Sequence, residues 1–97
     1  MSCRRLTGEI DIFEGINLRD VNQYTAHSAA NCTLDADPPK DFQVSNQSST
    51  LGPLDCHINT GCSWRENDNK TYGAGLNAAG GQVLAFWWMD DGMRICK

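Results

Sequence analysis

The stretch GEIDIFEGIN, residues 8–17, places three carboxylates among large apolar side chains. Side chains alternate between the two faces of a β-strand, so Glu9 and Asp11 share a face, whereas Glu14 has the opposite parity. A β-bulge at residues 12–13 would add one residue, return Glu14 to the acidic face and leave one of the inserted pair facing the core. The pattern therefore predicts a bulged strand that presents all three acids on one surface.

Three carboxylates on one face repel one another, so we expect at least one of them to have a raised pKa. Asp11 lies between the two glutamates and could share protons with either. Retaining glycoside hydrolysis uses carboxyl groups about 5 to 5.5 Å apart, and inverting hydrolysis uses groups about 6.5 to 9.5 Å apart. The Cα atoms of Glu9 and Glu14 would be roughly 13 Å apart on a bulged strand. Spacing alone leaves both outcomes open, as well as a solvated or cation-binding acidic face.

Strand signals continue on both sides of this stretch. Alternation and β-branched residues predict a strand over residues 7–13, and alternation over residues 23–28 predicts a second strand that forms a hairpin with the first. Near the end of the chain we expect a strand over residues 82–89, an Asp-Gly turn at residues 91–92 and a strand from Met93. Because no stretch of useful length has a helical period, the predicted fold class is all-β.

The middle of the chain has a different composition. Residues 32–62 contain all three prolines and many Ser, Asn and Asp residues, which predicts a long surface loop rather than core. Such a loop is usually functional or tied down, here by cysteines. The few remaining strands could bury only a small core, which favours the interpretation that the chain is part of a larger domain.

The bulk composition limits the possible partners. With 97 residues, 40% of them hydrophobic, the chain has the make-up of one globular domain or a piece of one. The net charge is −4, and no basic cluster exceeds Arg4 and Arg5, so we expect no nucleic-acid partner. No apolar window approaches the roughly 18 residues of a membrane span, and the first residues lack the apolar region of a signal peptide. We therefore expect no membrane partner.

Cysteines and glycosylation acceptors favour an oxidising compartment. The five cysteines are Cys3, Cys32, Cys56, Cys62 and Cys96, and Asn31, Asn46 and Asn69 begin Asn-x-Ser/Thr sequons. Both features are typical of secreted proteins. Because five is odd, at least one thiol must stay free or pair outside the chain. Secreted-type chemistry without a signal peptide again favours the fragment interpretation.

Two apparent ligand motifs are better explained without a ligand. The run GAGLNA at residues 73–78 imitates a dinucleotide fingerprint but lacks the required strand-then-helix setting. Asp35, Asp37 and Asp41 lack the glycine and terminal glutamate of a calcium-binding loop, so we interpret them as solvated loop acids.

The cysteines of the middle segment are also better explained without a metal. Cys56, His57 and Cys62 match no common zinc spacing, and a fourth ligand is missing. A disulfide is the preferred interpretation, either between Cys56 and Cys62 or with Cys32. We expect neither a metal nor another cofactor.

Several blocks in a fixed order reveal a family resemblance. GEIDIFEGIN is followed by NQYTAHSAANCTL, GCSW and YGAGLNAAGGQVLAFWW. These blocks resemble the fungal endo-β-1,3(4)-glucanases of glycoside hydrolase family 16, over roughly residues 8–34 and 56–93. The resemblance implies a concanavalin-like β-jelly-roll sandwich of antiparallel strands, of which residues 1–97 are a fragment. Residues 7–34 would be the catalytic hairpin, 35–62 a surface loop and 63–97 later sheet strands.

The resemblance also implies roles for individual residues. It makes Glu9 the nucleophile, Glu14 the general acid/base and Asp11 the helper that tunes them electrostatically. His27 matches a family histidine on the neighbouring strand that faces the catalytic carboxylates, and it is a candidate substrate-binding residue. The alternative is a histidine that simply satisfies its hydrogen bonds on a sheet face.

Two adjacent tryptophans fall on opposite faces of their expected strand, so at most one can stack on a sugar ring. Trp88 matches a family tryptophan and is the candidate for substrate binding. Trp87 stands where many relatives carry an acidic residue. For either one, core packing is the preferred interpretation.

The function implied is extracellular, endo-acting hydrolysis of β-1,3 and mixed-linkage β-1,3(4)-glucans with retention, without an obligate protein partner. The alternative is a truncated remnant that is catalytically inert or merely binds β-glucan. A small disulfide-stapled binding module is a third possibility.

Overall fold

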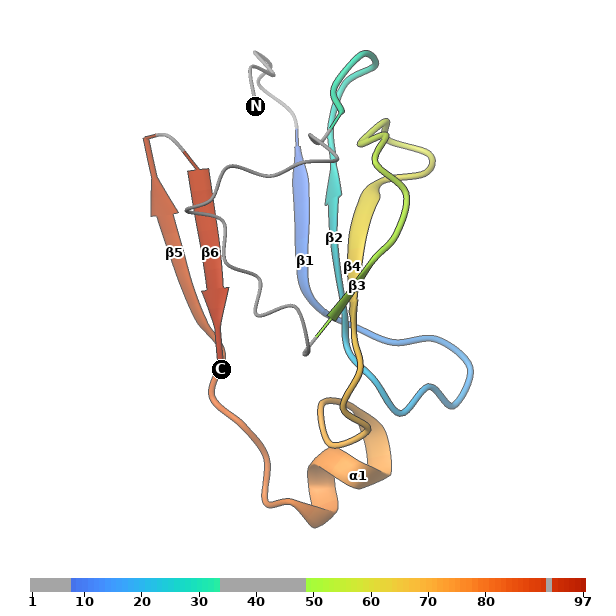
Figure 1. The fold of residues 1–97 in the computed structure, drawn as a ribbon, viewed down its shortest axis with the longest axis vertical. Helices are drawn as coiled ribbons and strands as arrows, with labels where there is room; N and C mark the ends of the chain where they lie inside the picture. Colours follow the sequence, from blue (N-terminus) through green and yellow to red (C-terminus); the bar gives the residue numbers. More distant parts are fainter. Residues whose placement is uncertain (1–7, 34–48, 91) are drawn as a thin grey trace.

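The computed structural model describes residues 8–33, 49–90 and 92–97. These ranges contain β1 (Glu9–Glu14), β2 (Gln23–His27), β3 (Ser49–Leu51), β4 (Cys62–Glu66), α1 (Gly73–Ala78), β5 (Ala85–Met89) and β6 (Gly92–Cys96). The ladders are all antiparallel apart from one isolated bridge, which confirms the predicted all-β class (Figure 1). Several residues named above lie outside the described ranges: Cys3, Arg4, Arg5, Asp35, Asp37, Asp41, Asn46 and the first residue of the predicted 91–92 turn.

Four strands form one sheet in the order β1-β2-β4-β3. β1 and β2 pair as the predicted hairpin, with Glu9 opposite His27 and Asp11 opposite Thr25. The next pair is Glu14 opposite Gln23, so β1 advances three residues while β2 advances two. One extra residue on β1 is a β-bulge, which confirms the bulge predicted from the spacing of the three acids.

One strand of this sheet, β3, comes from the segment predicted to be a loop. β3 and the first residue of β4 lie within residues 32–62, so the loop prediction is wrong for this described part. The strands are short, and β4 is held in the sheet by pairing with β2 on one side and β3 on the other. Backbone hydrogen bonds to neighbouring strands can hold a polar segment that has little apolar alternation of its own.

The register separates the sheet into two faces, because residues paired across antiparallel strands point to the same side. One side, called the polar face here, carries Glu9, Asp11, Glu14, Gln23, Thr25, His27, Ser63 and Arg65. The opposite side carries Ile10, Tyr24, Ala26, Cys62, Trp64 and Glu66. Gln23, Thr25 and His27 thus share one face, as expected for the strand predicted over residues 23–28.

The buried apolar core of the described residues is small. It consists of Ala26, Cys32, Cys56 and Cys62. Cys56 and Cys62 form a disulfide with an S–S distance of 2.11 Å, which confirms the preferred disulfide interpretation. Cys96, in contrast, is an exposed free thiol. A small core supported by a disulfide is what the sparse apolar content predicts.

β5 and β6 form a separate two-stranded ladder, to the left of the main sheet in Figure 1. β5 begins three residues later than predicted, and β6 begins one residue earlier. Trp87 and Trp88 are 61% and 70% exposed, so the prediction that they pack in a core is wrong. The reason is that no other described helix or strand packs extensively on either face of this hairpin. Phe86 instead contacts Trp88 edge-on, and Arg94 lies over the Trp87 ring.

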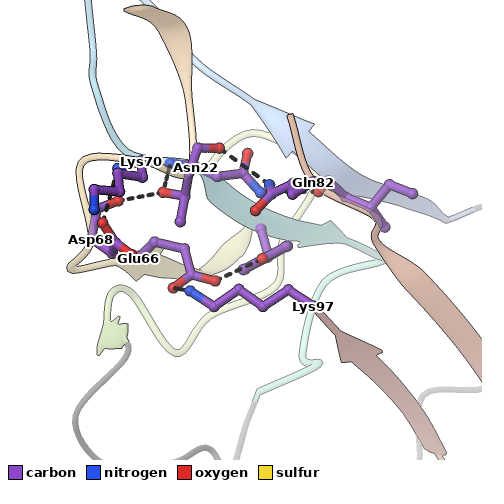
Figure 2. A network of polar contacts seen from close by, with 9 residues as sticks. Asn22, Glu66, Asp68, Lys70, Gln82 and Lys97 are labelled. Atoms are coloured by element: carbon purple, nitrogen blue, oxygen red, sulfur yellow. Dashed lines mark hydrogen bonds and ion pairs between the residues drawn. The ribbon is translucent and has the colours of Figure 1, made fainter. Parts of the chain in front are cut away.

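Polar contacts join the end of this hairpin and its approach segment to the main sheet (Figure 2). Lys97 Nζ donates to Glu66 Oε2 at 2.9 Å, and Tyr24 donates its hydroxyl to Glu66 Oε1 at 2.7 Å. Gln82 Nε2 donates to the Thr71 carbonyl at 3.3 Å. Because the Glu66 carboxylate is buried, the hydrogen bonds from Lys97 and Tyr24 offset the cost of removing its charge from water.

The short helix α1 was not expected from the sequence. Two of its six residues are glycines, which weaken a helix, and six residues are too few to establish a helical period. Gly75 lies directly against the Asn69 carbonyl, where a Cβ atom would not fit. Across the described part of the chain, no helix is both long and apolar enough to span a membrane.

Candidate active site

The three predicted carboxylates share the polar face because the bulge restores the parity of Glu14. Glu9 is exposed near the start of β1, whereas Asp11 and Glu14 are half-buried. Their cross-strand partners are His27, Thr25 and Gln23, respectively. A single strand thus presents three acids to one surface, and each acid has a polar neighbour on β2.

Asp11 is the acid whose titration the site perturbs. Burial raises the pKa of Asp11 above its ordinary value of 3.8, and the charge of Glu9 and a side-chain hydrogen bond with Glu9 act in the same direction. The charge of His27 and its hydrogen bond to Asp11 act to lower the pKa. His27 Nε2 lies 3.4 Å from Asp11 Oδ2. Asp11 is thus the acid with the raised pKa, and His27 lies beside it on the neighbouring strand.

Glu14 is held through both its backbone and its side chain. Thr25 Oγ1 donates a hydrogen bond of 2.7 Å to Glu14 Oε2. The Glu14 backbone N–H donates to Asn22 Oδ1 at 2.8 Å, while Asn22 Nδ2 donates to the Ile12 carbonyl at 3.1 Å. The Asn22 side chain therefore satisfies two backbone groups on either side of the bulge, where strand pairing is interrupted.

Asn22 is itself fixed by a segment distant in the sequence. Its exposed fraction is 0%, and its backbone N–H donates to Thr71 Oγ1 at 3.0 Å. The Thr71 hydroxyl in turn donates to the Asp68 carbonyl at 2.7 Å. Figure 2 shows Asn22 beside this turn. The turn after β4 thus supports the residue that shapes the bulge on β1.

A glycine next to His27 keeps the polar face closely packed. Gly61 lies one residue before β4 and has a φ of +70°, a backbone conformation that residues with a Cβ atom rarely adopt. A Cβ atom there would lie 2.6 Å from Thr25 Cγ2 and 2.7 Å from His27 Cε1. His27 Nδ1 is buried without a hydrogen-bond partner, so the ring makes its polar contact through Nε2 alone.

Sequence reasoning missed Asn22, Thr25 and Gly61 as parts of the site. Thr25 carried a usable signal, because it alternates with His27 and so faces the same side as the acids. Asn22 and Gly61 carried none, since their importance depends on contacts with other strands. Trp88 belongs to the other sheet, so strand pairing does not bring it to the carboxylates.

The site residues do not form an evident metal centre. Within residues 8–33, 49–90 and 92–97, no group of three or more His, Cys, Asp or Glu side chains is arranged to hold a metal ion. The chemistry available at the polar face is that of carboxyl groups with different surroundings: one perturbed by burial and a neighbouring acid, and one held by a hydroxyl donor. Such pairs suit nucleophilic and acid–base catalysis.

Comparison with known proteins gives the family. A family model described as an XgeA-like, catalytic GH16 domain matches residues 4–97. A probable glycosidase of Schizosaccharomyces pombe is 30% identical over 87 residues, which cover 90% of this chain and 21% of the relative. A probable endo-1,3(4)-beta-glucanase of Neosartorya fischeri is 34% identical over 88 residues, covering 91% of this chain and 13% of the relative.

A third relative, an endo-1,3(4)-beta-glucanase of Arthroderma benhamiae, is 30% identical over 91 residues, covering 93% of this chain and 20% of the relative. The chain thus spans about a fifth or less of the length of these three relatives. No solved structure matches the chain significantly. The family match covers nearly the whole chain and agrees with the bulged acidic strand and the antiparallel sheets. The chain therefore belongs to glycoside hydrolase family 16, among the XgeA-like catalytic domains.

Proposed function

We propose that the protein is an endo-acting β-glucanase that hydrolyses β-1,3 and mixed-linkage β-1,3(4)-glucans with retention of anomeric configuration. The observation that carries the proposal is the β1 register, which gathers Glu9, Asp11 and Glu14 on one face in a chain of this family. Two of the relatives are named endo-1,3(4)-beta-glucanases, which supports the substrate class.

In the proposed mechanism, Glu9 attacks the anomeric carbon while Glu14 protonates the departing glycosidic oxygen. Glu14 then removes a proton from water, which attacks the glycosyl-enzyme bond and releases the sugar with Glu9 regenerated. Asp11 has a raised pKa and a hydrogen bond with Glu9, so its protonated form can donate to the nucleophile and orient it. His27 limits the movement of Asp11 through their 3.4 Å contact.

The proposal extends to substrate contacts and to the organisation of the chain. His27 would also contact the sugar beside the carboxylates, and exposed Trp88 would stack on a more distant sugar ring. Residues 7–34 would act as the catalytic hairpin and 63–97 as later strands of the same domain.

An extracellular location is part of the proposal. The Cys56–Cys62 disulfide is of the kind that persists in oxidising compartments. Asn31 and Asn69, which begin two of the three sequons, are both exposed and therefore accessible to glycosylation. A lower mass of the natural protein after removal of N-linked glycans would support this location. An unchanged mass would argue against glycosylation of any sequon.

The test of function is release of reducing sugar from laminarin and from mixed-linkage glucan by the full-length protein, with Glu9→Gln and Glu14→Gln as variants. We expect both variants to lose turnover, and we expect NMR of the first product to show the retained anomer. On a dinitrophenyl β-glycoside, whose leaving group departs without an acid, azide should restore turnover by Glu14→Gln, because an anionic nucleophile does not need the missing base. Azide should not restore turnover by Glu9→Gln.

Two results would contradict the proposal. Turnover that survives Glu9→Gln would remove the nucleophile assignment. Binding to insoluble β-1,3-glucan without hydrolysis, unaffected by the two substitutions together, would instead identify a glucan-binding protein.

A further inference from the structure

Four side chains form a continuous series of hydrogen bonds that ends on Glu14. Arg19 Nη1 donates to Gln23 Oε1 at 2.7 Å, and Gln23 Nε2 donates to Thr25 Oγ1 at 3.2 Å. Thr25 Oγ1 then donates to Glu14 Oε2 at 2.7 Å. Every donor in the series therefore points toward the carboxyl group of Glu14.

The chemistry of the first member sets the direction of the whole series. A guanidinium group can only donate, so Arg19 must face the carbonyl oxygen of the Gln23 amide. The NH₂ group of Gln23 is then left to donate to Thr25. A threonine hydroxyl has a single proton, and because Thr25 Oγ1 accepts from Gln23, it directs that proton to Glu14.

The direction of the last bond distinguishes the two oxygens of Glu14. Oε2 always accepts from Thr25, whether Glu14 is charged or neutral. A proton on Oε2 would force the Thr25 hydroxyl to find another acceptor, and its second neighbour, the Gln23 NH₂ group, is a donor. Thr25 is only 4% exposed, so bulk water cannot easily serve as that acceptor.

We infer that Thr25, oriented by Gln23 and Arg19, is a positioning residue that reserves Glu14 Oε1 as the oxygen that carries the catalytic proton. This inference rests on the proposed function, in which Glu14 protonates the leaving oxygen. The bond to Oε2 also limits rotation of the carboxyl group, so Oε1 keeps one direction through both steps of the reaction. Glu14 thereby gives its proton and later takes one from water at the same atom.

The test compares two substrates of the full-length protein whose leaving groups differ in their need for protonation. The leaving group of laminarin is a sugar alkoxide, which needs an acid. The leaving group of a dinitrophenyl β-glycoside of a β-1,3-linked disaccharide is a stable phenolate, which does not. We expect Thr25→Val to lower kcat/KM for laminarin about 10- to 100-fold, the range for loss of one hydrogen bond to a charged group. The value for the aryl glycoside should change less than about threefold.

Two further variants separate positioning from stability. Thr25→Ser keeps the hydroxyl and should restore the laminarin rate to within a fewfold of the unsubstituted protein. Gln23→Met removes the group that orients Thr25, and it should give a smaller loss with the same dependence on the leaving group. Because Gln23 is half-buried, this variant tests the series even where Thr25→Val folds poorly.

Tyr24→Phe is the matched control, since Tyr24 is the neighbour of Thr25 on β2, lies on the opposite face, and donates its hydroxyl at 2.7 Å to Glu66, a carboxylate outside the proposed catalytic group. Any loss it causes should be equal for the two substrates. An equal loss for both substrates in Thr25→Val, or no rescue by Thr25→Ser, would overturn the inference while leaving the proposed function intact. No turnover of either substrate by the unsubstituted protein would overturn the proposed function and the inference together.

Discussion

Replacement of Asn22 by alanine tests whether one buried amide shapes the catalytic strand. The substitution removes the acceptor for the Glu14 N–H, at 2.8 Å, and the donor to the Ile12 carbonyl, at 3.1 Å. Leaving a buried polar group unsatisfied costs about 1 to 3 kcal/mol. Both backbone groups are partly buried, so we use the lower half of that range for each and expect the free energy of unfolding to fall by about 2 to 4 kcal/mol.

The effect on activity follows from the position of the bulge. Without Asn22, the backbone between Ile12 and Glu14 can relax toward regular pairing, and regular pairing would turn Glu14 away from the polar face. We therefore expect kcat on laminarin to fall by more than the change in KM.

Urea unfolding and steady-state kinetics of the full-length protein measure the two effects. Asn77→Ala is the control, because Asn77 is exposed on α1 and its replacement should change the free energy of unfolding by less than about 0.5 kcal/mol. A loss below about 1 kcal/mol for Asn22→Ala, with unchanged kcat, would refute the reasoning and show that strand pairing alone holds the bulge.

Three further predictions concern the same sheet. Because burial and Glu9 raise the pKa of Asp11, its stabilising contribution is present below pH 3.8 and is lost as the pH rises through the raised value. Asp11→Asn should thus increase the free energy of unfolding at neutral pH while lowering kcat. A lower free energy of unfolding, measured by urea unfolding, would contradict this. Gly61→Ala would place a Cβ atom 2.6 Å from a methyl carbon on β2, at a residue whose φ is +70°. We expect it to lower the free energy of unfolding by about 1 to 3 kcal/mol. An unchanged midpoint of urea unfolding would show that the neighbouring backbone moves to make room. Burial and the hydrogen bond to Glu66 raise the pKa of Tyr24 to about 12, so stability attributable to Tyr24 is lost as the pH rises through that value. Glu66→Gln should lower this pKa yet leave it above the ordinary 10.0, because burial is the larger cause; an ultraviolet titration of tyrosinate compares the two proteins, and a value that falls to 10.0 would assign the shift to Glu66 instead.

The sequence by itself determined the features that depend on local spacing. The interval between Asp11 and Glu14 required an extra residue if the acids were to share a face, and β1 has it. Period-two alternation correctly predicted β2 and its pairing with β1, and the Asp-Gly signal correctly predicted the β5–β6 hairpin. These features are predictable because strand geometry relates each side chain to neighbours a few residues away.

Only the tertiary structure decided the features that depend on distant partners. β3 and β4 exist through pairing with other strands. Trp87 and Trp88 are exposed because no other described helix or strand packs extensively on the faces of their hairpin. The bulge is stabilised by Asn22, which is fixed by Thr71, a residue 49 positions away. Such contacts leave no periodic trace in the sequence, because their free energy comes from burial and hydrogen bonds formed only after the chain has folded.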